Sequence, residues 1–171
     1  GAGMIGLALV QALSRAGCGR LVVVDVAKER LQVAKQFGAT NVMDASNSDV
    51  PGAVMELTGG KGADVVFEAV GLNGTVQSAL SCLRKGGAAT LVGNVTPRIE
   101  FPLQVVVTRE LTVRGTCASK GDYPACLDML ARGDLNASPL ISATASLSEG
   151  AAWFDRLYRR EPGLLKVVLV N

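Results

Sequence analysis

The first six residues carry a spacing of glycines that could bind phosphate. Gly1, Gly3 and Gly6 match G-x-G-x-x-G, and residues 4–16 are typical of a helix. In a dinucleotide-binding turn the first glycine permits a tight turn, the second lets a pyrophosphate approach the backbone, and the third allows close helix packing. The free N–H groups at the helix N-terminus would then face the phosphates. Alone the pattern is not specific, because glycine-rich turns are common.

A carboxylate follows where such a site needs one. Asp25 ends the apolar run at residues 21–24, which is typical of a short strand. A carboxylate there can accept hydrogen bonds from both hydroxyls of an adenosine ribose, and its charge would repel the 2′-phosphate of NADP. The two features together therefore predict a site for NAD. The alternative is that Asp25 only caps a helix beginning near Lys28.

Strand-like and helix-like segments alternate along the chain and would position these residues. Apolar runs typical of buried strands lie at residues 21–24, 41–43, 64–67, 88–92 and 111–113. Segments with helical spacing lie at residues 28–37, 50–58, 75–83 and 123–131. Gly86 and Gly87 are expected to separate a helix from the next strand. This order predicts an α/β fold, a doubly wound parallel sheet of the Rossmann type with right-handed crossovers.

The alternation ends near Gly133. After it we expect an apolar segment at residues 139–141, a helix over residues 148–160 with Ser148 as its N-cap, and a strand over residues 166–170. The strand that should precede the glycine turn does not occur in the sequence, and the sheet would lack this first, central strand. Its omission would leave a gap in the ladder. We therefore expect the chain to be a fragment of a longer polypeptide, unless another segment fills the gap.

The residue types limit the chemistry that the chain can perform alone. It contains no histidine, and its four cysteines (Cys18, Cys82, Cys117 and Cys126) form no C-x-x-C pair. Histidine is the commonest zinc ligand and acid–base group, so we assign neither a catalytic residue nor a metal ligand. The cysteines lie in apolar segments, which predicts buried free thiols and a reducing compartment, the cytoplasm.

Charge and hydropathy exclude two classes of partner. The formal net charge is +2, and no run of Lys or Arg exceeds two residues, so nucleic acid is not an expected partner. No apolar stretch approaches the roughly 18 residues that span a bilayer, so no membrane association is expected.

Taken together, several segments resemble the coenzyme domain of the medium-chain, zinc-dependent alcohol dehydrogenase family. They are the glycine turn and the segments at residues 24–25, 30–39, 68–71, 86–87 and 92–93. Residues 101–103 and 108–111 are most similar to the sorbitol (L-iditol) branch and the related polyol or threonine dehydrogenases. The resemblance covers essentially the whole chain, and the combination is more specific than the glycine turn.

The resemblance implies a set of cofactor-binding residues. In chain order they are Gly1, Gly3, Met4, Ile5, Gly6, Asp25, Arg30, Val70, Gly71, Val92, Gly93, Asn94, Thr116, Cys117 and Lys166. The first five would line the pyrophosphate turn, and the next two would lie at the adenosine ribose. Val70 and Gly71 would pass by the adenine and its ribose. Residues 92–94 and 116–117 would approach the nicotinamide. Lys166 would reach the pyrophosphate, although Arg30 and Lys166 can equally be read as surface charges.

The resemblance also implies how the complete protein works. Residues 1–138 would form the dinucleotide-binding domain, and residues 139–171 would belong to the catalytic domain, where zinc is held by residues outside this chain. The enzyme would transfer a hydride between a secondary alcohol or polyol and NAD. It would be a homo-oligomer, a dimer or tetramer, paired through the edge strand at residues 111–115.

Two other functions stay open. A stand-alone NAD-binding module without activity is favoured by the absence of histidine. A zinc-free quinone or enone reductase of the same superfamily is disfavoured by Asp25, because such relatives prefer NADP. Glu68 lies at a strand end, and we interpret it as a cofactor-contacting or supporting residue rather than as an acid.

Overall fold

The computed structural model describes residues 1–171, which divide into two compact units. Unit 1 contains Gly1, Val24–Val26 and Met43–Lys120, and unit 2 contains Ala2–Val23, Ala27–Val42 and Gly121–Asn171. Each unit has its own buried apolar clusters, and the two are described separately. No helix of the structure has the length and apolar character needed to cross a lipid bilayer.

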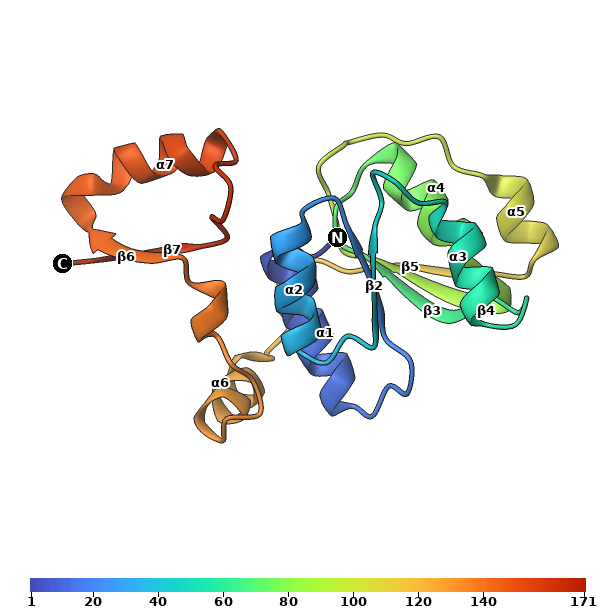
Figure 1. Ribbon diagram of the computed structural model, residues 1–171, viewed down its shortest axis with the longest axis horizontal. Coiled ribbons are helices and arrows are strands. Elements are labelled where there is room, and N and C mark those ends of the chain that lie inside the picture. The colour runs from blue at the N-terminus through green and yellow to red at the C-terminus, as the bar shows by residue number, and fades with distance from the viewer. The chain divides into compact units, whose positions relative to one another are not determined.

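Unit 1 is built on a three-stranded parallel sheet. Its strands follow the order β3-β4-β5 and span Ala63–Glu68, Leu83–Leu91 and Thr112–Gly115. Its helices are α3 (Val50–Leu57), α4 (Asn73–Cys82) and α5 (Leu103–Thr108). Helix α4 packs on β3 and β4 and contacts both other helices (Figure 1). Val76, Leu80, Leu83 and Ala89 form the core between helix and sheet.

The strands β1 (Val22–Asp25) and β2 (Asn41–Asp44) form a separate two-stranded sheet. Their carboxyl ends belong to unit 1 and their amino ends to unit 2. The sequence predicts a single doubly wound sheet, whereas the structure has the pair β1–β2 apart from the sheet β3-β4-β5. Val65 of the edge strand β3 is left 52% exposed.

Unit 2 contains the helix that follows the glycine turn and the C-terminal elements. Its elements besides the amino ends of β1 and β2 are α1 (Met4–Arg15), α2 (Lys28–Gln36), α6 (Tyr123–Ala131), η1 (Ser138–Leu140), β6 (Ala143–Ser146), η2 (Leu147–Glu149), α7 (Gly150–Tyr158) and β7 (Val167–Val170). Helix α1 buries Gly6, Leu7 and Val10 on one face, in keeping with its helical spacing. The side chains of Leu7 and Val10 pack with Leu31 of α2 and with Leu140. Strands β6 and β7 pair in parallel (Figure 1).

The structure differs from the sequence prediction in four local elements. Helix α5 and strand β6 were not predicted. Gly86 and Gly87 lie within β4 rather than before it, in an irregular stretch of its pairing with β3. The cap before α7 is Ser146 rather than Ser148, because Ser146 and Glu149 form a capping box that starts the short helix η2.

The prediction of four buried thiols is wrong for three of them. All four cysteines are free, and Cys82 is buried, but Cys18, Cys117 and Cys126 are exposed. Cys18 and Cys117 lie in irregular segments between helices and strands, and α6, which carries Cys126, has no buried residue. An apolar sequence context therefore did not guarantee burial at these positions.

Candidate functional site

The carboxyl ends of the three strands in unit 1 are aligned. Glu68 of β3 pairs with Leu91 of β4, which in turn pairs with Gly115 of β5. The chain therefore leaves all three strands at one edge, through residues 69–71, 92–94 and 116–117. In open parallel sheets this carboxyl edge is where ligands bind. Seven of the residues predicted from the resemblance lie in these three segments.

The segments after β3 and β4 are bonded to each other through Glu68. The main-chain oxygen of Glu68 accepts hydrogen bonds from the N–H groups of Val92 (2.8 Å) and Gly93 (2.9 Å). Its carboxylate accepts bonds from the N–H of Val70 (2.9 Å) and, with both oxygens, from the N–H of Gly71 (3.1 and 2.9 Å). The side chain is only 3% exposed. These bonds compensate the buried charge and fix the path of residues 69–71.

This arrangement defines the role of Glu68. Both carboxylate oxygens accept backbone N–H groups, so the group organises the edge. The sequence placed Glu68 at a strand end but could not specify which donors it meets. An acidic residue that ends an apolar strand directly before Ala-Val-Gly is the pattern that identifies it.

Two glycines allow the segments after β3 and β4 to touch. Gly71 has a φ of +81°, and a Cβ built on it would lie 2.6 Å from the nitrogen of Val95 and closer still to Gly93 and Asn94. A Cβ on Gly93 would collide with the backbone of Val70 and Gly71. The oxygen of Gly71 also accepts a bond from the N–H of Thr96 (2.9 Å). Only glycine fits at these two positions, and the contact brings predicted site residues of two strands together.

Gly1 and Asp25 lie near the same edge of unit 1. A Cβ on Gly1 would lie 2.5 Å from the Cγ2 atom of Val70, so the first glycine of the turn is in close contact with the segment after β3. The carboxylates of Asp25 and Glu68 are both within electrostatic range of the Gly1 nitrogen. Asp25 is the last residue of β1, as predicted.

The rest of the glycine turn belongs to unit 2 and opens α1. Gly3 is the N-cap, and its oxygen accepts the first helical bond from the N–H of Leu7 (2.8 Å). No side chain caps the helix and no acidic residue lies in its first turn. A Cβ on Gly3 would meet no atom within 4 Å. The N–H groups of Met4, Ile5 and Gly6 have no acceptor within the helix, so this end suits an anion.

Two further predicted residues, Arg30 and Lys166, also lie in unit 2. Arg30 is in α2 and lines a cavity with residues of the C-terminal segment, including Arg156 and Glu161. Lys166 precedes β7, is exposed, and accepts a hydrogen bond on its main-chain oxygen from the N–H of Ser142 (2.7 Å). Their roles in cofactor binding stay predictions.

The chain offers no candidate metal site. No group of three His, Cys, Asp or Glu side chains lies where it could hold an ion. The two exposed cysteines after β5 and in α6, Cys117 and Cys126, are not part of any such group. The residues present therefore do not fit a zinc ion, and no step of the chemistry is assigned to one within this chain.

Comparison with known proteins agrees with this geometry. The family model described as "Zinc-binding dehydrogenase" matches residues 5–132. The chain belongs to this family. The match covers most of the chain and includes α1 except Met4, the β1–β2 pair and the whole sheet of unit 1.

Individual relatives are similar over nearly the whole chain but are much longer. The chain is 29% identical to the D-xylulose reductase of Saccharomyces cerevisiae, over 99% of the chain and 49% of that protein. It is 35% identical to a sorbitol dehydrogenase of Arabidopsis thaliana, over 87% of the chain and 42% of that protein. Among solved structures, alcohol dehydrogenase TADH from Thermus sp. ATN1 is 32% identical with a TM-score of 0.90, covering 99% of the chain and 49% of that structure. The chain thus spans about half the length of the relatives it matches.

Proposed function

We propose that this chain is the NAD-binding part of a dehydrogenase that oxidises a secondary alcohol or polyol. The observation that carries the proposal is the carboxyl edge of unit 1, where Glu68 and the Gly71–Gly93 contact bring the segments after β3 and β4 together. Membership of the zinc-binding dehydrogenase family supports it. The names of the relatives, which include sorbitol dehydrogenase and D-xylulose reductase, support a polyol as the substrate class.

The adenosine and phosphate groups of NAD are assigned to the start of the chain. The backbone of Gly1, Gly3, Met4, Ile5 and Gly6 would receive the pyrophosphate, since the first turn of α1 has uncapped N–H groups and no acidic side chain. Asp25 would accept hydrogen bonds from the two ribose hydroxyls. Arg30 would lie beside the ribose, and Lys166 would add a positive charge for the pyrophosphate.

The remaining edge residues are assigned to the rest of the cofactor. Val70 and Gly71 would line the adenine and its ribose, and Val92, Gly93, Asn94, Thr116 and Cys117 would line the nicotinamide. Bound NAD supplies the hydride acceptor, and this chain holds and orients it. The chain's backbone at this edge is held by Glu68, so the cofactor would meet a preformed surface.

The rest of the enzyme is assigned outside this chain. We assign residues 1–138 to the dinucleotide-binding domain and residues 139–171 to a return segment that packs with the catalytic domain. That domain would hold the family's zinc, which the residues of this chain do not fit. Strand β5 is the last strand of its sheet, and its open edge supports pairing between copies in a dimer or tetramer.

The proposal is tested by cofactor titration of the full-length protein. NADH fluorescence should saturate at lower concentration than NADPH fluorescence, because the charge of Asp25 disfavours the 2′-phosphate. Asp25→Ser should weaken NADH binding about tenfold and improve NADPH binding, since it removes both the acceptor and the repulsion. Asp49→Ser, at the N-cap of α3, is the matched control and should leave the preference unchanged.

The same titration separates the alternative functions. Preference of the unaltered protein for NADPH would contradict the proposal and favour a zinc-free reductase. NADH binding without turnover of any secondary alcohol or polyol by zinc-loaded protein would instead indicate a binding module.

A further inference from the structure

The buried side chain of Gln11 joins helix α1 to a segment far along the sequence. Its Nε2 donates to the main-chain oxygen of Asn136 (3.0 Å), and its Oε1 accepts from the N–H of the same residue (2.7 Å). Gln11 is only 7% exposed. One amide side chain therefore satisfies both backbone groups of one residue, in the manner of a strand partner.

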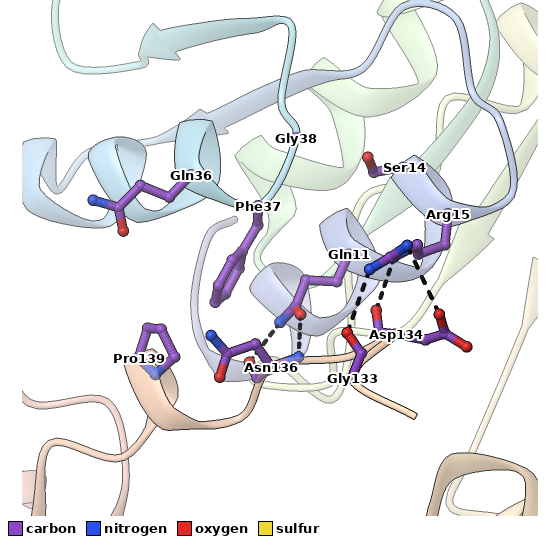
Figure 2. Close-up of a pocket in the computed structure, with 10 residues that line it drawn as sticks. All are labelled: Gln11, Ser14, Arg15, Gln36, Phe37, Gly38, Gly133, Asp134, Asn136 and Pro139. Atoms are coloured by element: carbon purple, nitrogen blue, oxygen red, sulfur yellow. Dashed lines mark hydrogen bonds and ion pairs between the residues drawn. The ribbon is translucent and has the colours of Figure 1, made fainter. Parts of the chain in front are cut away.

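Arg15 holds the same segment one helical turn further along α1. Its guanidinium donates to the main-chain oxygens of Asp134 (3.0 Å) and Gly133 (3.3 Å), and it lies 3.7 Å from the Asp134 carboxylate. Gln11 and Arg15 are four residues apart and so share one face of the helix. Figure 2 shows both side chains directed at residues 133–136.

A cavity adjoins this contact. It has a volume of about 520 Å³ and is bounded by α1, by the end of α2 at Gln36 and Phe37, and by residues 133–139. Within it the Gln11 amide is paired with the backbone of Asn136, and the Arg15 guanidinium with Gly133 and Asp134 (Figure 2). No unpartnered buried side-chain atom points into it. The cavity is therefore the site of an internal contact between α1 and the segment.

The held segment leads into the C-terminal elements of unit 2. Leu140 of η1 is buried in the cluster that contains Leu7 and Val10 of α1, so the chain is fixed again directly after residue 136. Residues 133–140 are therefore packed along α1 and do not form a free linker between α6 and β6.

We propose that Gln11 is a positioning residue that couples cofactor binding at the start of α1 to the segment leading into residues 139–171. The inference rests on the proposed function, in which the first turn of α1 receives the pyrophosphate. NAD bound there stabilises α1, and the Gln11–Asn136 pair transmits this stability to residues 133–140. Gln11 lies two helical turns from Gly3 and is not assigned to the cofactor itself.

Amide hydrogen exchange on the full-length protein tests the contact without cofactor. Gln11→Met preserves side-chain volume but removes both hydrogen bonds, and it should accelerate exchange at residues 133–140 about tenfold. Gln36→Met, on the opposite wall of the same cavity, is the matched control and should leave that exchange unchanged. Gln11→Glu keeps the acceptor for the Asn136 N–H but sets a carboxylate oxygen against the Asn136 carbonyl oxygen, so it should accelerate exchange at least as much as Gln11→Met. Equal rates in the Met variants would overturn the proposed contact.

A second measurement tests the coupling. Saturating NADH should slow exchange at residues 133–140 in the unaltered protein and in Gln36→Met, but not in Gln11→Met, while NADH affinity changes less than about threefold. A role in stability alone would leave this response to NADH intact. Slowing of exchange by NADH to the same extent in Gln11→Met would overturn the coupling. If the unaltered protein fails to bind NADH, the proposed function is overturned. The Gln11–Asn136 contact, which is measured without cofactor, would still hold in that case.

Discussion

The carboxyl edge of unit 1 and the C-terminal helix α7 are held in opposite ways. At the edge, hydrogen bonds join segments after different strands, and both carboxylate oxygens of the buried Glu68 accept backbone N–H groups. In α7 the ion pair of Arg156 and Glu161 links residues five apart in sequence, and Phe154 and Tyr158 are 71% and 89% exposed. The first region is held by bonds within this chain, whereas the second leaves large aromatic side chains exposed. The edge is thus held from within this chain, whereas the aromatic side chains of α7 would be buried only in the arrangement proposed for residues 139–171.

The largest effect is expected from filling the contact between the two loops of the edge. Gly93→Ala places a methyl group against the backbone of Val70 and Gly71, and should lower the free energy of unfolding by about 3 kcal/mol. Gly74→Ala, in α4 with open space around it, should instead be neutral or raise stability by up to about 1 kcal/mol. Urea unfolding of the unaltered protein, Gly93→Ala and Gly74→Ala measures both changes in the free energy of unfolding. An unaffected Gly93→Ala would mean that the loops do not touch.

A smaller loss is expected from changing the chemistry of the edge while keeping its shape. Glu68→Gln replaces an acceptor oxygen with an N–H₂ group that faces backbone donors, and should cost about 2 kcal/mol of unfolding free energy. NADH affinity should fall about tenfold, since residues 70–71 lose their anchor. The exposed Glu29 provides the control, and Glu29→Gln should change neither quantity. If Glu68→Gln behaves like this control, the carboxylate does not organise the edge.

The exposed side of α7 gives the complementary test. If the rest of the enzyme covers this helix, Phe154→Ser in the full-length protein should lower stability by about 1.5 kcal/mol through lost apolar burial. Ala152→Ser, at an exposed position of the same helix, should cost only the small helix-propensity difference of about 0.5 kcal/mol. Thermal unfolding compares the two. Similar losses would indicate that Phe154 stays in water and that α7 has no covering partner.

The smallest expected effect concerns the reactivity of two thiols, one buried in the core of unit 1 and one exposed. Burial raises the pKa of Cys82 to about 11, with a further contribution from Asp49. Since the folded-state pKa is raised, the thiol stays protonated at neutral pH, and the stability that this provides is lost only as the pH rises from about 9 towards 11. At pH 8 iodoacetamide should therefore modify the exposed Cys18 long before Cys82, as mass spectrometry can follow. Equal rates would show that the core around Cys82 opens readily.

Sequence reasoning predicted the elements whose patterns are local. The glycine turn, the end of β1 at Asp25 and the order of most strands and helices follow from spacing and apolar periodicity. Helix α5 escaped prediction because its Val105-Val106-Val107 run has the β-branched character of a strand. Strand β6 escaped because Ala143–Ser146 is short and weakly apolar, and it is defined by pairing with the distant β7.

The sequence offers candidate site residues but not the geometry that brings them together. Spacing indicated which residues follow each strand, yet the register that aligns Glu68, Leu91 and Gly115 depends on pairing between distant segments. The contact of Gly71 with Gly93 and the Gln11–Asn136 pair are likewise long-range. No local pattern encodes such contacts, so the resemblance supplied the residues and only the structure supplied the contacts that hold them.

The central claim is that NAD binds at the carboxyl edge of unit 1, and amide chemical shifts of the full-length protein on NADH addition test it most directly. The account predicts saturable shifts at Val70, Gly71 and residues 92–94, with no direct effect on α7. Binding of NADH that leaves the amides of Gly71 and Gly93 unmoved would contradict it.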